Sequence, residues 1–173
     1  MAAHRICREA FAEEFGAAVQ EIGFSVLVNH GVDTRLYDEI EARTEARFTA
    51  TPMAEKMRFR AKRHGSVSQG YFPIRETSDI HPDLVEGWVW CRRAFDMPQE
   101  RDAPFQPADF WSNPADEPVF RQLALAHEAL FKPITQAMFQ GLGIDPHVYD
   151  DKLTNTNFGL RLNYYPPLTD ADD

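Results

Sequence analysis

The feature that most constrains the fold of this 173-residue chain is a long amphipathic segment near its C-terminal end. Its apolar residues recur every three or four positions, as on one face of a helix. The stripe consists of Phe120, Leu123, Leu130, Phe131, Ile134 and Met138, and it includes His127, which we interpret as a core histidine. Pro133 predicts a kink, and Gly141 and Gly143 predict the helix end. Other elements must cover a stripe of this length.

The N-terminal segment has the same helical periodicity. Phe11, Phe15, Val19 and Ile22 are spaced as on one buried helix face, which predicts a helix over residues 7–22 that ends at Gly23. The next stretch, "FSVLVN" at residues 24–29, is short and rich in β-branched residues. It is predicted to be a buried strand, with the turn after it at residues 30–31.

Capping signals predict two further helices. Asp33 or Thr34 can cap a helix that buries Leu36, Ile40 and Phe48. Thr51 is predicted as the N-cap of the next helix, with Pro52 at its first position, where the missing N–H is tolerated.

The middle of the chain is less regular. Its composition predicts a loop at residues 65–72 ("GSVSQGYF"), and "EGWVW" up to Trp90 predicts a strand whose two tryptophans share a face. Residues 96–118, rich in proline, are expected to form an irregular connection.

The closing segment "FGLRLNYYPP" predicts a strand with two unlike faces. Because strand side chains alternate, Phe158, Leu160, Leu162 and Tyr164 share one face and Arg161, Asn163 and Tyr165 share the other. The first face is apolar. The second gathers a cation, an amide and a phenol, which suits a site that binds a carboxylate, or else simply faces water. The sequence pattern leaves both interpretations open.

Composition excludes several functional classes. The net charge is −9, from 18 Lys+Arg and 27 Asp+Glu, and the basic run "KMRFRAKRH" is short, so nucleic acid is not expected as a partner. No apolar run approaches the length of a membrane span, and no signal peptide is evident. A soluble cytoplasmic protein is therefore predicted. Cys7 and Cys91 lie in no metal-binding pattern and are expected to be reduced thiols.

Six segments together resemble the N-terminal half of the isopenicillin N synthase-like family of non-haem iron(II), 2-oxoglutarate-dependent oxygenases. They occur in the family's order: "GFSVLVNHGVD" (23–33), "FTATPMAEKMRF" (48–59), "QGYF" (69–72), "DLVEGWVW" (83–90), "FRQLALAHEALFKPITQAMFQGLGID" (120–145) and "LRLNYYPP" (160–167). The resemblance implies an α+β fold in which a helix-rich region with a few strands, residues 1–115, precedes residues 116–173. The latter hold a long spine helix and the first strand of a jelly-roll (double-stranded β-helix) core that is otherwise missing.

The same resemblance implies roles for the polar face of the closing strand. Tyr165 would hold the distal carboxylate of 2-oxoglutarate, Asn163 would lie near the oxoacid and the metal, and Arg161 would face substrate or co-substrate. Family members bind Fe(II) through a His-x-Asp pair and a later His, which would follow Asp173. The internal pair His81 and Asp83 sits on a substrate-side loop and is interpreted as a decoy, so no metal ligand is predicted within this chain.

The function implied for the full-length parent is oxidation of a C–H bond of a small molecule with O2, while 2-oxoglutarate is decarboxylated to succinate and CO2. A related branch of the family uses iron and O2 without the oxoacid, so the co-substrate stays open. The 173-residue chain alone is not expected to be catalytically complete. The alternative is a truncated, non-catalytic paralogue that acts as a binding or interaction module. It would have to cover the apolar face of its long helix and the free edge of its last strand.

Overall fold

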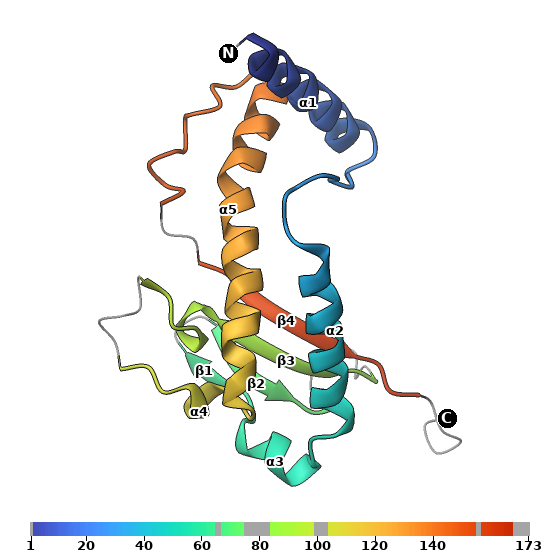
Figure 1. Ribbon diagram of the computed structural model, residues 1–173, viewed down its shortest axis with the longest axis vertical. Helices are drawn as coiled ribbons and strands as arrows, with labels where there is room; N and C mark the ends of the chain where they lie inside the picture. The colour runs from blue at the N-terminus through green and yellow to red at the C-terminus, as the bar shows by residue number, and fades with distance from the viewer. Residues whose placement is uncertain (1, 65–66, 75–83, 99–103, 155–156, 168–173) are drawn as a thin grey trace. The chain divides into compact units, whose positions relative to one another are not determined.

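The computed structural model describes residues 2–64, 67–74, 84–98, 104–154 and 157–167. These residues form a helix-rich α+β structure with one small antiparallel sheet (Figure 1). The chain divides into two compact units: a helical unit, Met1–Val32 with Ala124–Thr156, and a sheet unit, Asp33–Leu123 with Asn157–Asp173. None of the helices in the described ranges combines the length and apolar character that a membrane span requires.

The sheet unit is built on four antiparallel strands that neighbour one another in chain order. They are β1 (Lys62–His64), β2 (Val67–Phe72), β3 (Glu86–Cys91) and β4 (Gly159–Tyr164). β3 and β4 confirm the two predicted strands. The predicted loop at residues 65–72 is wrong for its described part, because residues 67–72 form β2. Pairing with β3 stabilises this strand despite its glycine and serine content.

Helix α2 (Thr34–Thr49) begins where its capping signal predicts. The Asp33 carboxylate accepts a hydrogen bond from the Arg35 backbone N–H at 3.0 Å. The expected residues Leu36, Ile40 and Phe48 are buried. Helix α3 (Met53–Arg58) follows, but its N-cap is Pro52 and no side chain caps it, so the prediction of a Thr51 cap is wrong.

The core of the sheet unit is aromatic and encloses a cation. Trp88 and Trp90 of β3 share a face, as predicted, and Trp90 stacks on Trp111 with ring centroids 4.3 Å apart. The Arg47 guanidinium lies over both β3 tryptophans, 4.9 and 5.0 Å from their ring centroids, and pairs with the buried carboxylate of Asp116. Burial lowers the pKa of Arg47, while Asp116 opposes that shift.

In the described part of the proline-rich connection after β3, irregular segments alternate with short helical turns. These are η1 (Arg92–Ala94), α4 (Pro107–Phe110) and η3 (Pro114–Asp116). Helix α5 (Glu117–Gly141) then confirms the long helix and runs through Pro133. Its first turns belong to the sheet unit, where Phe120 and Leu123 are buried, and the rest belongs to the helical unit. His127 lies on an exposed part of α5, so its interpretation as a core histidine is wrong.

In the helical unit, α1 (Ala2–Glu21) crosses α5 through two glycines. A Cβ atom on Gly16 would lie 2.9 Å from the Gly141 Cα, so only residues without a side chain allow this approach. The helix predicted at residues 7–22 is confirmed, but its predicted buried face is not. Ala12 and Gly16 are buried, whereas Phe11 is 41% exposed and Ile22 is 72% exposed.

Residues 24–29 do not form the predicted buried strand. No strand is assigned to them, and Phe24, Val26 and Val28 are exposed. A strand needs a neighbour to pair with, and none of the described residues provides one.

Candidate functional site

The candidate site lies on β4, the strand whose polar face the sequence singles out. Six residue pairs join β4 to β3, from Glu86 opposite Tyr164 to Cys91 opposite Gly159. Along β4 the alternation is as predicted: Leu162 is buried and Tyr164 is half-buried, whereas Arg161 and Asn163 are exposed. The structure therefore places the two predicted polar residues together on one face.

Arg161 and Asn163 contact each other directly. The Arg161 Nε donates to the Asn163 Oδ1 at 2.8 Å. Within the described residues, no carboxylate pairs with Arg161. Its two terminal Nη groups are therefore available to a planar anion, and the amide of Asn163 fixes the plane in which the guanidinium lies.

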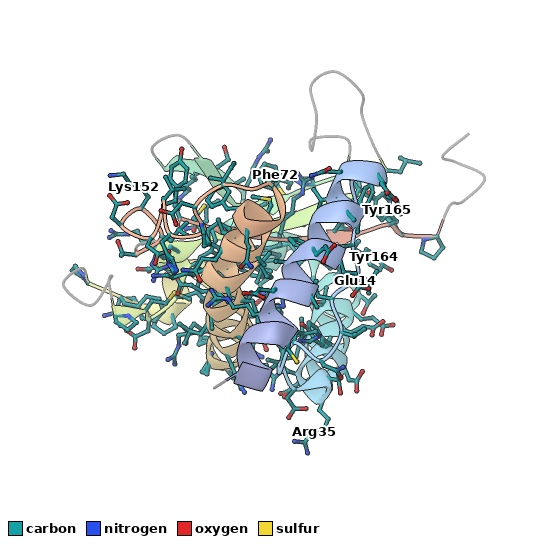
Figure 2. The ribbon with its side chains drawn as sticks, turned by 90° about the horizontal axis from the view of Figure 1, so that it is seen from above. Glu14, Arg35, Phe72, Lys152, Tyr164 and Tyr165 are labelled. Atoms are coloured by element: carbon teal, nitrogen blue, oxygen red, sulfur yellow. The ribbon has the colours of Figure 1, made fainter. Side chains whose placement is uncertain are left out.

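Tyr165, the third predicted residue, follows the last residue of β4. Its side chain is 63% exposed. Figure 2 labels Tyr164 and Tyr165, which occupy consecutive positions at the end of the strand. No hydrogen bond joins Tyr165 to Arg161 or Asn163 in the structure. The phenol adds a donor near the strand end without being fixed to the other two side chains.

Neighbouring strands contribute residues to the same face, which the sequence analysis missed. Val89 lies directly opposite Arg161, and Gly87 lies opposite Asn163. Phe72 of β2 is in turn opposite Gly87, so it shares this face. Because Gly87 has no side chain, none stands between Phe72 and Asn163 in this row. The sequence analysis could not place Phe72 on this face, because it predicted a loop instead of β2 at residues 65–72.

The other face of the sheet is packed and holds β4 in place. Phe48 of α2 stacks on Tyr164 with ring centroids 5.4 Å apart. Glu86, the register partner of Tyr164, accepts hydrogen bonds from the Lys56 Nζ at 2.7 Å and the Tyr71 hydroxyl at 2.9 Å. The same Glu86 carboxylate oxygen therefore accepts both hydrogen bonds, which stabilises the buried ion pair. Among the described residues, these contacts hold β4 on the face opposite Arg161 and Asn163.

The described residues do not form a metal site. No group of three His, Cys, Asp or Glu side chains among them is arranged to hold a metal ion. The pair interpreted as a decoy, His81 and Asp83, lies outside the described residues, as does the acidic end of the chain at residues 168–173.

Two other histidines have local partners. His30 accepts a hydrogen bond from the Val32 backbone N–H through Nδ1 at 3.2 Å, which stabilises the turn expected there. The Nδ1 atom of His147 lies 3.0 Å from the Asp150 carboxylate. Asp150 also accepts from the Gln136 Nε2 at 2.7 Å and pairs with Lys132 at 3.1 Å. These contacts, Gln136 and His147 foremost, lower the pKa of Asp150 to about 2.

Residues 3–114 match the protein family described as "non-haem dioxygenase in morphine synthesis N-terminal". The match covers more than half of the chain. The chain belongs to this family of non-haem dioxygenase N-terminal regions. The resemblance inferred from the sequence motifs is thereby confirmed.

Two curated relatives of this dioxygenase N-terminal region carry oxygenase names. The 2-oxoglutarate-dependent dioxygenase tropC of Talaromyces stipitatus is 27% identical, over 92% of this chain and 53% of its own length. The oxoglutarate-dependent flavonoid 7-O-demethylase 1 of Ocimum basilicum is also 27% identical, over 92% of this chain and 41% of its own. The chain thus spans about half the length of the curated relatives it matches.

Solved structures share the fold. A 2OG-Fe(II) oxygenase family protein from Caulobacter crescentus superposes with a TM-score of 0.70 at 24% identity, over 97% of this chain and 55% of its own. A Neurospora crassa protein solved at full length in complex with alpha-KG gives a TM-score of 0.69 at 23% identity, over 95% and 51% of the two chains. The dioxygenase N-terminal region described here has the fold of the corresponding half of those proteins.

Proposed function

We propose that this chain is the N-terminal part of an iron(II)- and 2-oxoglutarate-dependent oxygenase that oxidises a C–H bond of a small molecule. Family membership and the names of the two curated relatives support this assignment. The observation that carries it is the Arg161–Asn163 pair, in which an oriented guanidinium without an acidic partner among the described residues occupies the exposed face of β4. Such a group binds a carboxylate, and 2-oxoglutarate has two.

We assign the three polar residues of β4 and its end to the co-substrate. Arg161 provides its two terminal nitrogen groups as donors to a carboxylate of the co-substrate or to a substrate anion. Asn163 orients the guanidinium and lies near the oxoacid and the metal, and Tyr165 donates to the distal carboxylate of 2-oxoglutarate. When bound, the metal and 2-oxoglutarate supply the oxidising chemistry with O2, and these side chains bind and orient the oxoacid.

We place the iron ligands and most of the jelly-roll core in polypeptide that follows Asp173. The relatives are about twice as long as the part matched, and the described residues offer no set of metal ligands. In this arrangement residues 1–115 form the N-terminal region, and residues 116–173 form the spine helix and first strand of the catalytic domain.

The test uses the protein produced from its own reading frame beyond Asp173. We expect it to bind 2-oxoglutarate with Fe(II) present, measured by calorimetry, and to release succinate. Arg161→Ala should weaken 2-oxoglutarate binding about 10- to 100-fold, because a charge-assisted hydrogen bond contributes about 1.5–3 kcal/mol.

Arg93→Ala is the matched control, since Arg93 is an exposed arginine of the same unit outside β4. It should leave binding unchanged. Equal affinity of the Arg161→Ala variant and the unmodified protein would contradict the assignment of Arg161. A stop codon directly after Asp173 would favour the non-catalytic binding module instead.

A further inference from the structure

The basic run of the sequence, residues 56–64, has no role in the proposed function. Its first lysine, Lys56, forms a buried ion pair. Arg58, Arg60 and Lys62 are exposed instead, although the chain as a whole is acidic, with a net charge of −9. Exposed cations on an acidic protein create a strong local positive field only where they converge on one place.

These three cations do converge, because all of them line one cavity of the sheet unit. The cavity has a volume of about 260 Å³, and its walls come from α3, α4 and the first three strands. Asp109 of α4 is the only carboxylate among the described residues that line it. Three cations and one carboxylate give the lining a net charge of +2, which favours an anion with two negative charges.

The cavity and the candidate site on β4 use opposite faces of the sheet. Trp90 lines the cavity and stacks on Trp88, with which it shares the packed face. Its neighbour Val89 points to the other face, where it lies opposite Arg161. The sheet therefore separates a ligand in the cavity from Arg161 and Asn163. The cavity is a second site and not an extension of the oxoacid site.

Backbone hydrogen bonds hold the basic segment against β2. The Ala61 N–H donates to the Tyr71 carbonyl, and the Tyr71 N–H donates to the Phe59 carbonyl, both at 2.8 Å. Gly70 allows this approach, because a Cβ atom there would lie 2.9 Å from the Ala61 Cα. The backbone that carries two of the three cations is therefore fixed in position.

Gln69 of β2 adds a neutral donor to the lining. Its side chain is only 6% exposed. The Oε1 atom accepts a hydrogen bond from the Cys91 backbone N–H at 2.8 Å, so the Nε2 group remains as a donor without a partner in the described part of the chain. A nearly buried donor without a partner costs free energy, and an anion that accepts from it removes this cost.

The mixture of groups selects the class of ligand. A phosphate monoester carries about two negative charges at pH 7 and has three strong acceptor oxygens, which Arg and Lys bind through charge-assisted hydrogen bonds. A carboxylate has one charge and two oxygens, and it would leave part of this lining without a partner. Phe59 and Phe110 also line the cavity and are half-buried, so an apolar or aromatic body can lie against them.

We propose that this cavity binds the phosphate group of a small phosphorylated metabolite. The three cations and the Gln69 amide bind the phosphate oxygens, and the two phenylalanines contact the organic part of the ligand. The volume of about 260 Å³ is near the lower end of small-molecule pockets, about 300 Å³, so the ligand is small. The inference does not depend on the proposed function, because none of these residues belongs to the oxoacid site.

Calorimetry with phenyl phosphate tests the proposal. The protein produced from its own reading frame is titrated without Fe(II) and without 2-oxoglutarate, so that the result is independent of oxygenase activity. We expect saturable binding of one phenyl phosphate with a Kd below about 1 mM. The absence of saturable binding up to about 10 mM would overturn the inference, whether or not the protein binds 2-oxoglutarate.

Two further probes test the chemical class. Inorganic phosphate should bind more weakly than phenyl phosphate, because it has no apolar part to contact the phenylalanines. Phenylacetate carries a similar ring on a carboxylate and should bind at least about 10-fold more weakly than phenyl phosphate. Equal affinity for phenylacetate and phenyl phosphate would overturn the assignment to phosphate.

Substitutions at two of the cations locate the binding. Arg58→Gln and Lys62→Gln should each weaken phenyl phosphate binding about 10-fold, because each removes a charge-assisted hydrogen bond. Both side chains are exposed, so neither change should disturb the fold. Arg93→Gln is the matched control, since Arg93 is exposed and does not line the cavity, and it should leave the affinity unchanged. Unchanged affinity in both cavity variants would place the phosphate elsewhere and overturn the inference.

Removal of the carboxylate provides a test that misfolding cannot imitate. Asp109→Asn removes the negative charge that lines the cavity and should tighten phenyl phosphate binding about 3- to 10-fold. Asp38→Asn is the control, because Asp38 is an exposed carboxylate of α2 that does not line the cavity. It should change the Kd less than about 2-fold. An Asp109→Asn variant that binds no more tightly than this control would overturn the inference.

Discussion

The two units of the molecule differ in how they bury their apolar residues. The largest fully buried side chains all belong to the sheet unit: Trp88, Trp90, Trp111, Tyr71, Phe95, Phe120 and Met97. The buried apolar residues described in the helical unit are only Ala12 and Ala137. Large hydrophobics such as Phe24 and Val26 are exposed there instead. The sheet unit thus has a core of its own, whereas the helical unit rests on small-residue contacts and polar networks.

The two units therefore depend on different interactions. In the sheet unit, a buried charge among aromatic rings must be paired, so loss of its partner is severe. In the helical unit, the closest contact is between helix backbones at Gly16 and Gly141, so added volume is the main threat. Three substitutions test this contrast, and the first should change stability most.

Asp116→Ala should destabilise the sheet unit most. Asp116 accepts hydrogen bonds from Arg43 at 2.8 Å and from Asn113 at 3.2 Å, and it pairs with the buried Arg47. Its removal leaves the Arg47 charge buried with only the Ser112 hydroxyl as a hydrogen-bond acceptor among the described residues. We expect a loss of about 3–5 kcal/mol in the free energy of unfolding, measured in urea by circular dichroism.

Asp38→Ala is the control, because Asp38 is an exposed carboxylate on α2. It should change stability by less than about 0.5 kcal/mol. If both variants lose the same free energy of unfolding, the buried Arg47–Asp116 pair does not contribute to the stability of the sheet unit.

Gly16→Ala should destabilise the helical unit by about 1–2 kcal/mol. Alanine favours a helix over glycine by about 1 kcal/mol, but its Cβ would lie 2.9 Å from a backbone atom of Gly141, which cannot rotate away. The clash should outweigh the gain, and thermal unfolding measures the net effect. Gly159→Ala on β4, where a Cβ meets nothing within 4 Å, should be close to neutral. A stabilised Gly16→Ala variant would contradict the close helix crossing.

The smallest expected effect is that of Asp150→Asn on the pH dependence of the stability of the helical unit. Asp150 has a pKa of about 2 when folded, against an ordinary value of 3.8. Its contacts therefore stabilise the folded state above pH 3.8, and this contribution is lost as the pH falls toward 2. Asp150→Asn should remove this acid-dependent loss, measured by the unfolding midpoint between pH 5 and pH 2.

The neighbouring Asp151→Asn is the control, because Asp151 is exposed and pairs only with Lys152 among the described residues. This substitution should leave the change in unfolding midpoint between pH 5 and pH 2 the same as in the unmodified protein. If Asp150→Asn and Asp151→Asn behave alike, the Gln136–His147–Asp150 network does not stabilise the helical unit.

Local sequence signals predicted the elements that depend on local interactions. The Asp33 cap and the long α5 periodicity act within a few residues, so both were readable from the sequence. β2 was missed because its stability comes from pairing with β3, about twenty residues away, and not from its own composition. Residues 24–29 were predicted to be a buried strand because strand propensity does not reveal whether a partner strand is present.

The candidate site was predictable in part. Alternation along β4 placed Arg161 and Asn163 on one face, and the structure confirms this placement. Their hydrogen bond and the neighbours Val89 and Phe72 depend on strand register, which the sequence did not specify. Arg47 was also missed, although its position on the face of Ile40 and Leu36 was a signal that it could be buried.

The tryptophan cluster has a practical consequence for following this protein in solution. All three tryptophans of the sequence lie in the sheet unit, and two of them stack at 4.3 Å. Tryptophan fluorescence, excited selectively over tyrosine, therefore reports on the sheet unit alone, because the helical unit contains no tryptophan. A fluorophore attached to the exposed Cys7 of α1 would report on the helical unit. The unfolding rates of the two units could then be measured separately in one experiment.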